Sequence, residues 1–341
     1  MGLFNQNTQH AESSKYKQEN HSSDIVGIGS PLLDFTVEAP ESLLEEMELK
    51  KGQMHLIDQE KSRAIFKRLD GYKITKTPGG SAANTLAGIA NLGGRCVLFG
   101  KIGNDPNGDI YKLESERAGV KTRLNKHENI TGHAITFITT DSERTFATHL
   151  GAALHFQKED VIDDDIRNCK ILHIEGYLME LPELREATIH AMQIAKKNGV
   201  KISIDLADPG LISRIYQILH KIVNEYCDIV FVNEEEAQAF TGKDKVDALN
   251  IIYSMCDVAV VKLGENGSLI KANDTIHSIP VYKTNVVNTN GAGDMYAAGV
   301  LYGIANNIPF EKAGRIGSYT SSLVVSQVGA RLNEKIAIDK I

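Results

Sequence analysis

The residues with the clearest chemical potential are two glycines and an aspartate that precede an apolar helical segment. They lie in the stretch from Asn288 to Asp294, where Gly291, Ala292 and Gly293 come directly before Asp294. Bare backbone N–H groups at a helix start bind anions such as phosphate. A carboxylate beside them can accept a hydroxyl proton while they stabilise a phosphoryl group in transfer. The pattern predicts phosphoryl transfer to an alcohol; the alternative is a tight turn in which Asp294 only caps the helix.

A second glycine turn, far from the first in the chain, consists of Gly79 and Gly80 and leads into a predicted helix at Ser81. Glycines let a ligand approach the backbone closely, and the amide of Asn84, one turn later, can point at the same ligand. Asp34 follows the first predicted strand, and ligands of open α/β sheets bind beyond strand carboxyl ends. We therefore expect a hydroxyl-rich ligand, with Asp34 accepting from a diol. The alternatives are an ordinary capped turn and a solvated carboxylate.

Two further segments follow predicted strands. Asn233 and Glu236 share a helix face, and an amide with a carboxylate near phosphates suits Mg²⁺, usually through water. The alternative is an Asn cap followed by acidic residues that favour a helix start. Gly264 and Gly267 form a turn that either borders a nucleotide or simply joins two strands of a hairpin.

The elements that must position these residues alternate between short apolar runs and helical periods. This alternation predicts an α/β fold, a parallel sheet covered by helices on both faces. The predicted strands are Ile25 to Gly29, Val97 to Gly100, Ile171 to Ile174, Lys201 to Asp205, Ile229 to Val232 and Val258 to Val261. The predicted helices are Asp109 to Ala118, Leu184 to Asn198, Leu211 to Tyr226, Glu234 to Phe240, Met295 to Asn306 and Phe310 to Val328.

In one region, apolar and polar residues alternate with the period of two that is typical of a half-buried β-strand. Gly132 to Thr139 and Thr145 to His149 predict a hairpin, to which Phe35 to Val37 and Met54 to Ile57 add strands. A small antiparallel sheet outside the parallel one would act as a lid, excluding the water that competes as acceptor. We expect residues 1–23 to be a disordered leader, and residues 24–341 to form one folded domain, with a lid at about 34–58 and 121–152.

Composition excludes several classes of function. The chain has 341 residues and a formal net charge of −7 without a basic block, which weighs against nucleic-acid and anionic-membrane partners. The four cysteines are scattered, as in the reduced core of a cytoplasmic protein. There is no Walker-type P-loop, no complete dinucleotide fingerprint, and no apolar run that predicts a signal peptide or a membrane span.

Taken together, these segments resemble the phosphofructokinase-B family, also called ribokinase-like kinases. The N-terminal family motif is similar to Gly79-Gly80 through Gly103 to Gly108, and the C-terminal one to Asn288 through Gly303. Asn233-x-x-Glu236 looks like the family's magnesium motif. The resemblance implies a mostly parallel sheet flanked by helices, a small β-sheet lid, and an ATP-dependent phosphotransferase with an alcohol acceptor that uses Mg²⁺.

Within the family, Gly29 to Asp34, Leu49 to Gln53, Thr131-Gly132 and Arg144 to Ala153 are most similar to adenosine kinases. That branch implies phosphorylation of a ribonucleoside 5′-hydroxyl, with adenosine first. Inosine or guanosine kinase, a simple sugar kinase and a non-catalytic nucleoside sensor remain alternatives, as do a monomer and a homodimer.

The resemblance also implies roles for individual residues. Asp294 would be the base, Gly291 to Gly293 the anion hole, and Arg144 a phosphate ligand from the lid. The implied acceptor-binding residues are Ser30, Asp34, Gly79, Gly80, Ser81 and Asn84. The implied ATP-binding residues are Asn233, Gly264, Gly267, Asn290 and Ser318. Two departures stand out: Ser30 replaces the usual Asn of adenosine kinases, and Asn288 replaces a family Asp that supports a K⁺ site.

Overall fold

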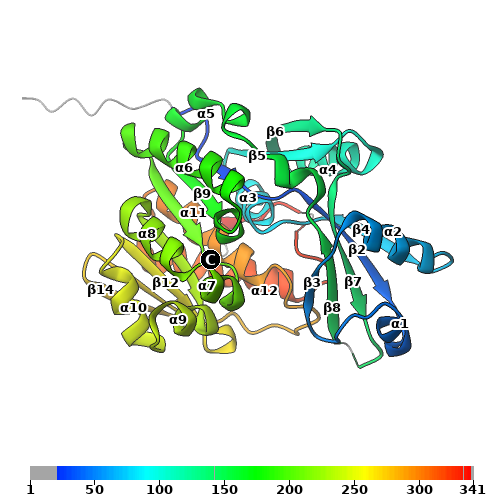
Figure 1. Ribbon diagram of the computed structural model, residues 1–341. Coiled ribbons are helices and arrows are strands. Elements are labelled where there is room, and N and C mark those ends of the chain that lie inside the picture. Colours follow the sequence, from blue (N-terminus) through cyan, green and yellow to red (C-terminus); the bar gives the residue numbers. More distant parts are fainter. Residues whose placement is uncertain (1–20, 142, 333, 339–341) are drawn as a thin grey trace, which may run out of the picture.

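The computed structural model describes residues 21–141, 143–332 and 334–338, and a nine-stranded sheet forms the centre of this part of the chain (Figure 1). In spatial order its strands are β14 (Thr275–Ile279), β13 (Ser268–Ala272), β12 (Val258–Lys262), β11 (Ile229–Asn233), β10 (Lys201–Asp205), β9 (Ile171–Glu175), β1 (Ile25–Ile28), β5 (Cys96–Gly103) and β6 (Val120–His127). In this order, all neighbouring strands from β12 across to β6 are parallel, and β13 and β14 form an antiparallel hairpin at the other end of the sheet.

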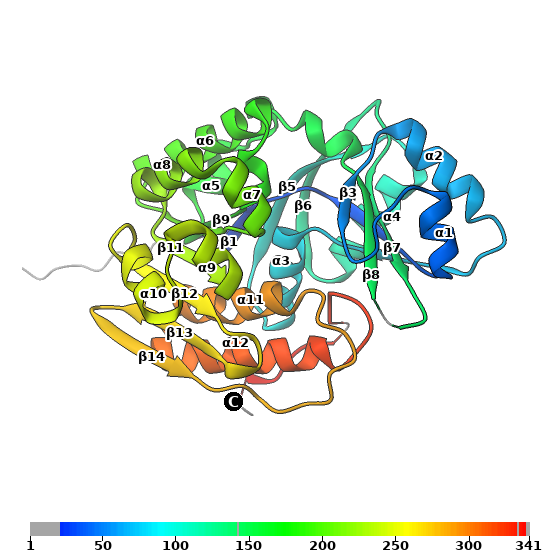
Figure 2. The same ribbon diagram turned by 60° about the horizontal axis from the view of Figure 1, so that its bottom comes forward.

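Helices cover both faces of this sheet because its parallel strands carry apolar side chains on both sides. On one face, Val26 and Ile28 pack in a cluster with α5 (Asp163–Arg167), α6 (Pro182–Lys197), α7 (Pro209–Arg214), α8 (Tyr216–Tyr226), α9 (Glu234–Thr241) and α10 (Lys245–Tyr253). On the other face, Ile25 packs in a cluster with α3 (Ser81–Asn91), α4 (Pro106–Arg117) and α11 (Ala292–Ala305). Helix α12 (Phe310–Val325) lies against α11 (Figure 2). The predicted strands and the family fold are confirmed.

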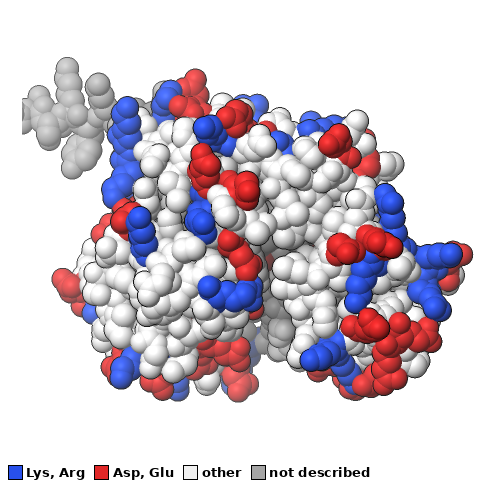
Figure 3. Space-filling model, in the orientation of Figure 1, with Lys and Arg blue, Asp and Glu red and all other residues white. Residues whose placement is uncertain are grey.

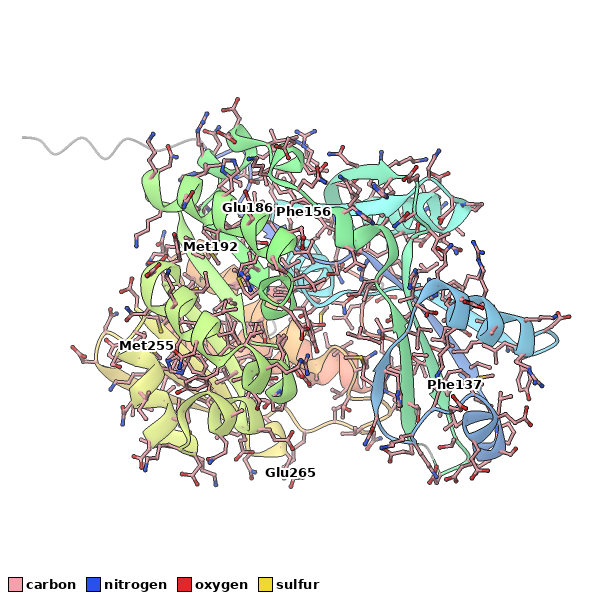
Figure 4. All side chains as sticks on the ribbon, viewed as in Figure 1. Phe137, Phe156, Glu186, Met192, Met255 and Glu265 are labelled. Carbon is pink, nitrogen blue, oxygen red and sulfur yellow. The ribbon has the colours of Figure 1, made fainter. Side chains whose placement is uncertain are left out.

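A smaller, five-stranded sheet lies beside the larger one. Its strands, in spatial order, are β3 (Met54–Leu56), β8 (Arg144–His149), β7 (Gly132–Ile138), β2 (Leu32–Glu38) and β4 (Ile74–Pro78). Alternate residues of β2, Leu33, Phe35 and Val37, are buried with the side chains of α1 (Glu41–Glu46) and α2 (Gln59–Arg68). Phe137, labelled in Figure 4, belongs to the same core. The opposite face of β2 therefore presents Asp34, Thr36 and Glu38.

The smaller sheet differs from the prediction in two respects. It is mixed rather than antiparallel, because β2 pairs in parallel with β7, and β3 with β8. Its boundaries also differ: β6, inside the predicted lid range, pairs along its whole length with β5 of the larger sheet, whereas β4, outside that range, pairs with β2. Strand partners of this kind are set by tertiary contacts that a period of two cannot reveal.

Three local boundaries also change. The helix predicted over residues 211–226 is two helices that meet at Ile215, and α12 ends at Val325 rather than Val328. Most of the predicted leader, residues 1–20, lies outside the described residues. The described chain is already held before Asp24, since the backbone N–H of Ser22 donates to the carbonyl of Asn168 at 2.9 Å and Ser23 is buried.

The remaining global expectations concern charge, thiols and membranes. Figure 3 shows acidic and basic side chains interspersed over one face, with a groove between the larger body and the smaller sheet. All four cysteines are free thiols, and Cys96, Cys169 and Cys227 are buried, as predicted for core residues. Within the described residues, none of the helices combines the length and apolar character needed to cross a lipid bilayer.

Candidate active site

The two glycine turns meet at Asp294. Gly291 caps α11 in a left-handed conformation with φ of 77°. Asp294 follows in the first turn, where its carboxylate accepts hydrogen bonds from Ser81 Oγ at 2.7 Å and from Asn84 Nδ2 at 2.9 Å. Both donors come from α3, more than 200 residues away in the chain. Because Gly291 is the N-cap and the Asp294 carboxylate bonds to α3, the alternative that Asp294 only caps its own helix does not hold.

The electrostatic surroundings of Asp294 favour a proton acceptor. Burial raises the pKa of this carboxyl above its ordinary value, the Asn84 and Ser81 hydrogen bonds lower it, and the nearby Asp205 raises it. A carboxylate with a raised pKa is a stronger base than one in water, and Asp294 keeps partial exposure where it lines a cavity.

The turn before α3 requires both of its glycines. A Cβ on Gly80, whose φ is 90°, would lie 2.4 Å from the carbonyl oxygen of Ser30. A Cβ on Gly79 would lie 2.5 Å from Oδ2 of Asp34, so the glycine allows this carboxylate to reach the turn. Burial raises the pKa of Asp34 to about 7, against the lowering effect of Arg331, and Asp294 raises it further. The second glycine turn thus lies against Asp34, and its role in binding an acceptor stays a prediction.

Two side chains that the sequence patterns missed hold this turn in place. Glu175, at the end of β9, accepts from the backbone N–H groups of Ser30 at 2.8 Å and Ala82 at 3.0 Å. Arg331 donates to Asn84 Oδ1 at 2.8 Å and to the carbonyl of Gly79 at 3.0 Å. A carboxylate directly after a buried strand was a usable signal for Glu175. Arg331 lies in an irregular segment with no such signal.

A cavity of about 480 Å³ opens between the smaller sheet and the loop before α11. Asp34 lies in it, and its walls carry hydroxyl and charged side chains from alternate positions of three strands. Its lining residues are Asp34, Thr36, Glu38, Lys73, Thr75, Thr77, Thr136, Ile138, Arg144, Asn288, Asn290, Val328, Gly329 and Ala330. We call it the acceptor cavity. None of these described lining residues is aromatic.

Arg144 and Asn288 join the smaller sheet to the larger body. Arg144 donates a hydrogen bond from its guanidinium to Asn288 Oδ1, and the backbone N–H of Asn290 donates to the same oxygen at 2.7 Å. Burial lowers the pKa of Arg144 from its ordinary value. Arg144 thus lines the acceptor cavity, and its predicted contact with a phosphate stays a prediction.

A second cavity, of about 440 Å³, is lined by Asp294, and we call it the nucleotide cavity. Asn290 lines both cavities. The lining residues of the nucleotide cavity are Ser81, Tyr177, Asp205, Ala207, Asn233, Glu236, Lys262, Gly264, Gly267, Asn290, Gly291, Ala292, Gly293, Asp294, Tyr296 and Ser321. The predicted anion hole and the predicted magnesium pair therefore face the same space.

Asn233 and Glu236 form the helix cap that their spacing predicted, and their binding of Mg²⁺ stays a prediction. They form a reciprocal cap at the start of α9, in which the Glu236 carboxylate accepts from Asn233 Nδ2 at 2.7 Å and from its backbone N–H at 2.8 Å. Burial raises the pKa of Glu236 to about 7, whereas Lys262 lowers it. Because each carboxylate oxygen already has a protein donor, the pair fits Mg²⁺ held through water better than direct coordination.

Of the remaining residues predicted to bind the nucleotide, two line the nucleotide cavity and Ser318 does not. Gly264 and Gly267 line the nucleotide cavity and also form the turn between β12 and β13, near Glu265 in Figure 4. Ser318 is not among the cavity residues: its hydroxyl donates to the carbonyl of Pro280 at 2.8 Å, and Ser321, nearly one turn later, lines the cavity instead. Ser30 likewise contributes its backbone to the Glu175 network and does not line the acceptor cavity.

Comparison with known proteins gives the family. The model of the pfkB family carbohydrate kinases matches residues 57–337. The chain belongs to this family. It is therefore a phosphotransferase with an alcohol acceptor, and kinases of this family use ATP and Mg²⁺.

The relatives include both nucleoside and sugar kinases. This pfkB kinase is 28% identical to adenosine kinase of Saccharomyces cerevisiae over 340 residues, which cover 93% of this chain and 99% of that protein. It is 30% identical to 5-dehydro-2-deoxygluconokinase of Bacillus subtilis over 266 residues, or 74% of this chain and 82% of that protein. The crystal structure of adenosine kinase from Sinorhizobium meliloti superposes with a TM-score of 0.84 and 32% identity, covering 92% and 97% of the two chains. The protein is thus a sugar or nucleoside kinase with the ribokinase-like fold.

Proposed function

We propose that this kinase transfers the terminal phosphoryl group of ATP to the 5′-hydroxyl of a ribonucleoside, with adenosine as the preferred acceptor. The supporting observation is that two cavities of different chemistry share Asn290, and that Asp294 lines the nucleotide cavity while its charge acts on Asp34 of the acceptor cavity. The acceptor cavity contains Asp34, suited to a diol; the nucleotide cavity contains the Gly291–Gly293 turn and the Asn233–Glu236 pair, suited to polyphosphate and Mg²⁺. The long match to an adenosine kinase favours the nucleoside.

In the proposed reaction, Asp34 binds two acceptor hydroxyls and holds the 5′-oxygen near Asp294. Asp294 accepts the hydroxyl proton as that oxygen attacks the terminal phosphorus, and the P–O bond to the leaving ADP breaks. The N–H groups at the start of α11 stabilise the charge on the phosphoryl group, as preorganised donors do in such reactions. Arg144 approaches the phosphate from the lid. Asn233 and Glu236 would hold Mg²⁺ through water, and the ion would neutralise part of the nucleotide's charge.

A second candidate, a sugar kinase, is favoured by the acceptor cavity itself. Its described lining includes four threonines, Glu38 and Lys73 and lacks an aromatic ring on which a flat base could stack. Hydroxyl and charged side chains match a hydroxyl-rich sugar. The match to a 5-dehydro-2-deoxygluconokinase agrees with this candidate.

A coupled ADP-release screen with Mg-ATP separates the candidates. The panel contains adenosine, inosine, guanosine, ribose, fructose and 5-dehydro-2-deoxygluconate, with Asp294→Asn as the control that reports background ATP hydrolysis. We expect the highest kcat/KM with adenosine. A higher kcat/KM for any sugar would replace the nucleoside proposal with the sugar kinase. Nucleoside binding without ADP release from any acceptor would favour a non-catalytic sensor.

A further inference from the structure

The nucleotide cavity has an unusual charge balance for a site that holds polyphosphate. Three carboxylates, those of Asp205, Glu236 and Asp294, line it. Among its described lining residues Lys262 is the one side chain with a positive charge. The terminal phosphates of ATP add further negative charge, and Mg²⁺ compensates only part of it. A cation fixed by the protein is therefore expected to contact these phosphates.

Lys262 is built into the rigid part of the site. It ends β12, where its Cα pairs in register with that of Asn233 on β11. Its Nζ donates to Asp205 Oδ2 at 2.6 Å, and both side chains are largely buried, with exposed fractions of 14% and 7%. Asp205 ends β10. The carboxyl ends of three neighbouring strands therefore supply Asp205, Asn233 and Lys262.

The ammonium group lies beside the anion hole. A Cβ placed on Gly293 would be 3.1 Å from Nζ of Lys262, so this glycine leaves open the short path between the ammonium and the start of α11. Asp205 is the hydrogen-bond partner of Nζ among the described residues. Because an ammonium has three N–H donors, two are available for a ligand in the cavity.

The neighbouring carboxylates keep this lysine charged. Burial alone lowers the pKa of a lysine, but Asp205 and Glu236 outweigh it, and the pKa of Lys262 is raised above its ordinary value. Arg144, the other cation predicted to act on phosphate, belongs to the smaller sheet and lines the acceptor cavity instead. Among the described residues that line the nucleotide cavity, Lys262 alone provides a fixed positive charge.

We propose that Lys262 is a catalytic residue that donates hydrogen bonds to the phosphoryl group during transfer, and that Asp205 is the positioning residue that orients its ammonium. The proposal rests on phosphoryl transfer at this site and does not depend on which alcohol is the acceptor. The competing explanation is that Lys262 only neutralises Asp205 and Glu236, with no contact to ATP.

Three variants, Lys262→Met, Asp205→Asn and the double variant, separate these explanations. Lys243→Met is the matched control, because Lys243 is exposed and lies outside both cavities. We expect Lys262→Met to lower kcat by about 10²–10³-fold, as loss of a preorganised charge donor does. Asp205→Asn should lower kcat less, because the ammonium remains. The double variant should have a melting temperature close to that of wild type, whereas its kcat should stay as low as that of Lys262→Met.

Nucleotide affinity without an acceptor provides a second measurement. We expect isothermal titration to show that Lys262→Met weakens the affinity for ATP by at least tenfold. The affinity for AMP should stay within about twofold of wild type, because AMP lacks the terminal phosphates. Recovery of half or more of wild-type kcat by the double variant would show that Lys262 is only a counterion. Equal ATP affinity in wild type and Lys262→Met would also overturn the proposal. If Lys262→Met fails to fold, the charge-neutral double variant carries both measurements.

This design keeps the acceptor question separate. The kinetic measurements use whichever alcohol the ADP-release screen identifies. If none is phosphorylated, the nucleoside proposal fails while the ATP and AMP titrations still test Lys262.

Discussion

The nucleotide and acceptor cavities differ in the side chains and in the structural elements that line them. The nucleotide side has buried charges at the ends of neighbouring parallel strands, such as the Lys262–Asp205 pair. The acceptor side has hydroxyl and charged side chains on one face of a small, mixed sheet, of which Glu38 and Lys73 are exposed. A buried ion pair tolerates little change, since loss of one partner leaves an uncompensated charge. Side chains on a sheet face exchange at lower cost, which suits a surface that selects among alcohols.

The comparison predicts that reactivity depends on the larger sheet and its helices. We expect Asp294→Asn to lower kcat by ~10²–10⁴-fold, the usual effect of losing a general base, while acceptor binding stays nearly intact. Steady-state kinetics and acceptor titration measure both quantities. A variant that retains more than half of wild-type kcat would disprove the assignment of Asp294 as base.

Acceptor affinity should instead depend on the smaller sheet. Asp34→Ala removes two charge-assisted hydrogen bonds to a diol, so acceptor binding should weaken by about 2–4 kcal/mol. The KM for ATP should stay close to wild type. Thr75→Val, in the same cavity but without a charge, serves as the control. A raised KM for ATP with an unchanged KM for the acceptor would place Asp34 in the nucleotide site.

Arg144 tests the boundary between the two regions. We expect Arg144→Ala to lower kcat by roughly ten- to a hundredfold, from the value of one charge-assisted hydrogen bond, and to raise either KM less. The reason is that its guanidinium neutralises phosphate only when the smaller sheet approaches the body. Asn288→Ala removes its partner in the structure and shows whether that contact matters. An unchanged kcat in Arg144→Ala would mean that the guanidinium only links the two parts.

The pKa of Asp34, raised to about 7, predicts that acceptor binding depends on pH. Because the raised pKa means that the folded protein binds this proton more tightly than the unfolded chain, the stability from this carboxyl is present at low pH and is lost as pH rises through about 7. Acceptor binding has the opposite dependence, since the diol needs the carboxylate. In the wild type without ATP, acceptor affinity should fall about fivefold from pH 7 to pH 6, because the ionised fraction of Asp34 falls from about one half to about one tenth. A flat profile would show that Asp34 is ionised throughout.

The smallest effect is expected from K⁺. Asn288 lacks the charge of a carboxylate, and its Oδ1 already accepts from Arg144 and from the backbone of Asn290. We therefore expect weak K⁺ activation that Asn288→Asp strengthens, since affinity for hard cations depends on ligand charge. The measurement is a KCl titration against tetramethylammonium at matched ionic strength. Strong, saturable activation of the wild type at low millimolar K⁺ would contradict this expectation.

The sequence by itself determined the fold class and the two glycine turns. Apolar strands in regular alternation with helices specify a covered parallel sheet, and turns such as Gly79-Gly80 and Gly291 to Gly293 are local features, since their backbone geometry depends on glycine itself. The reciprocal cap of Asn233 and Glu236 is equally local, with partners three residues apart. Patterns of this kind can be read without knowing the neighbours in space.

Only the tertiary structure decided which side chains complete the site. Glu175 holds residues 145 and 93 positions away in the chain, Arg331 reaches Asn84 across 247 positions, and Lys262 pairs with Asp205 across 57. Arg331 carries no local pattern that distinguishes it from a solvated residue, and the position of Glu175 at a strand end does not reveal its partners. The pairing of β4 with β2 and the mixed order of the smaller sheet were hidden for the same reason. Their stability comes from desolvated contacts between distant segments, and such contacts exist only once the chain has folded.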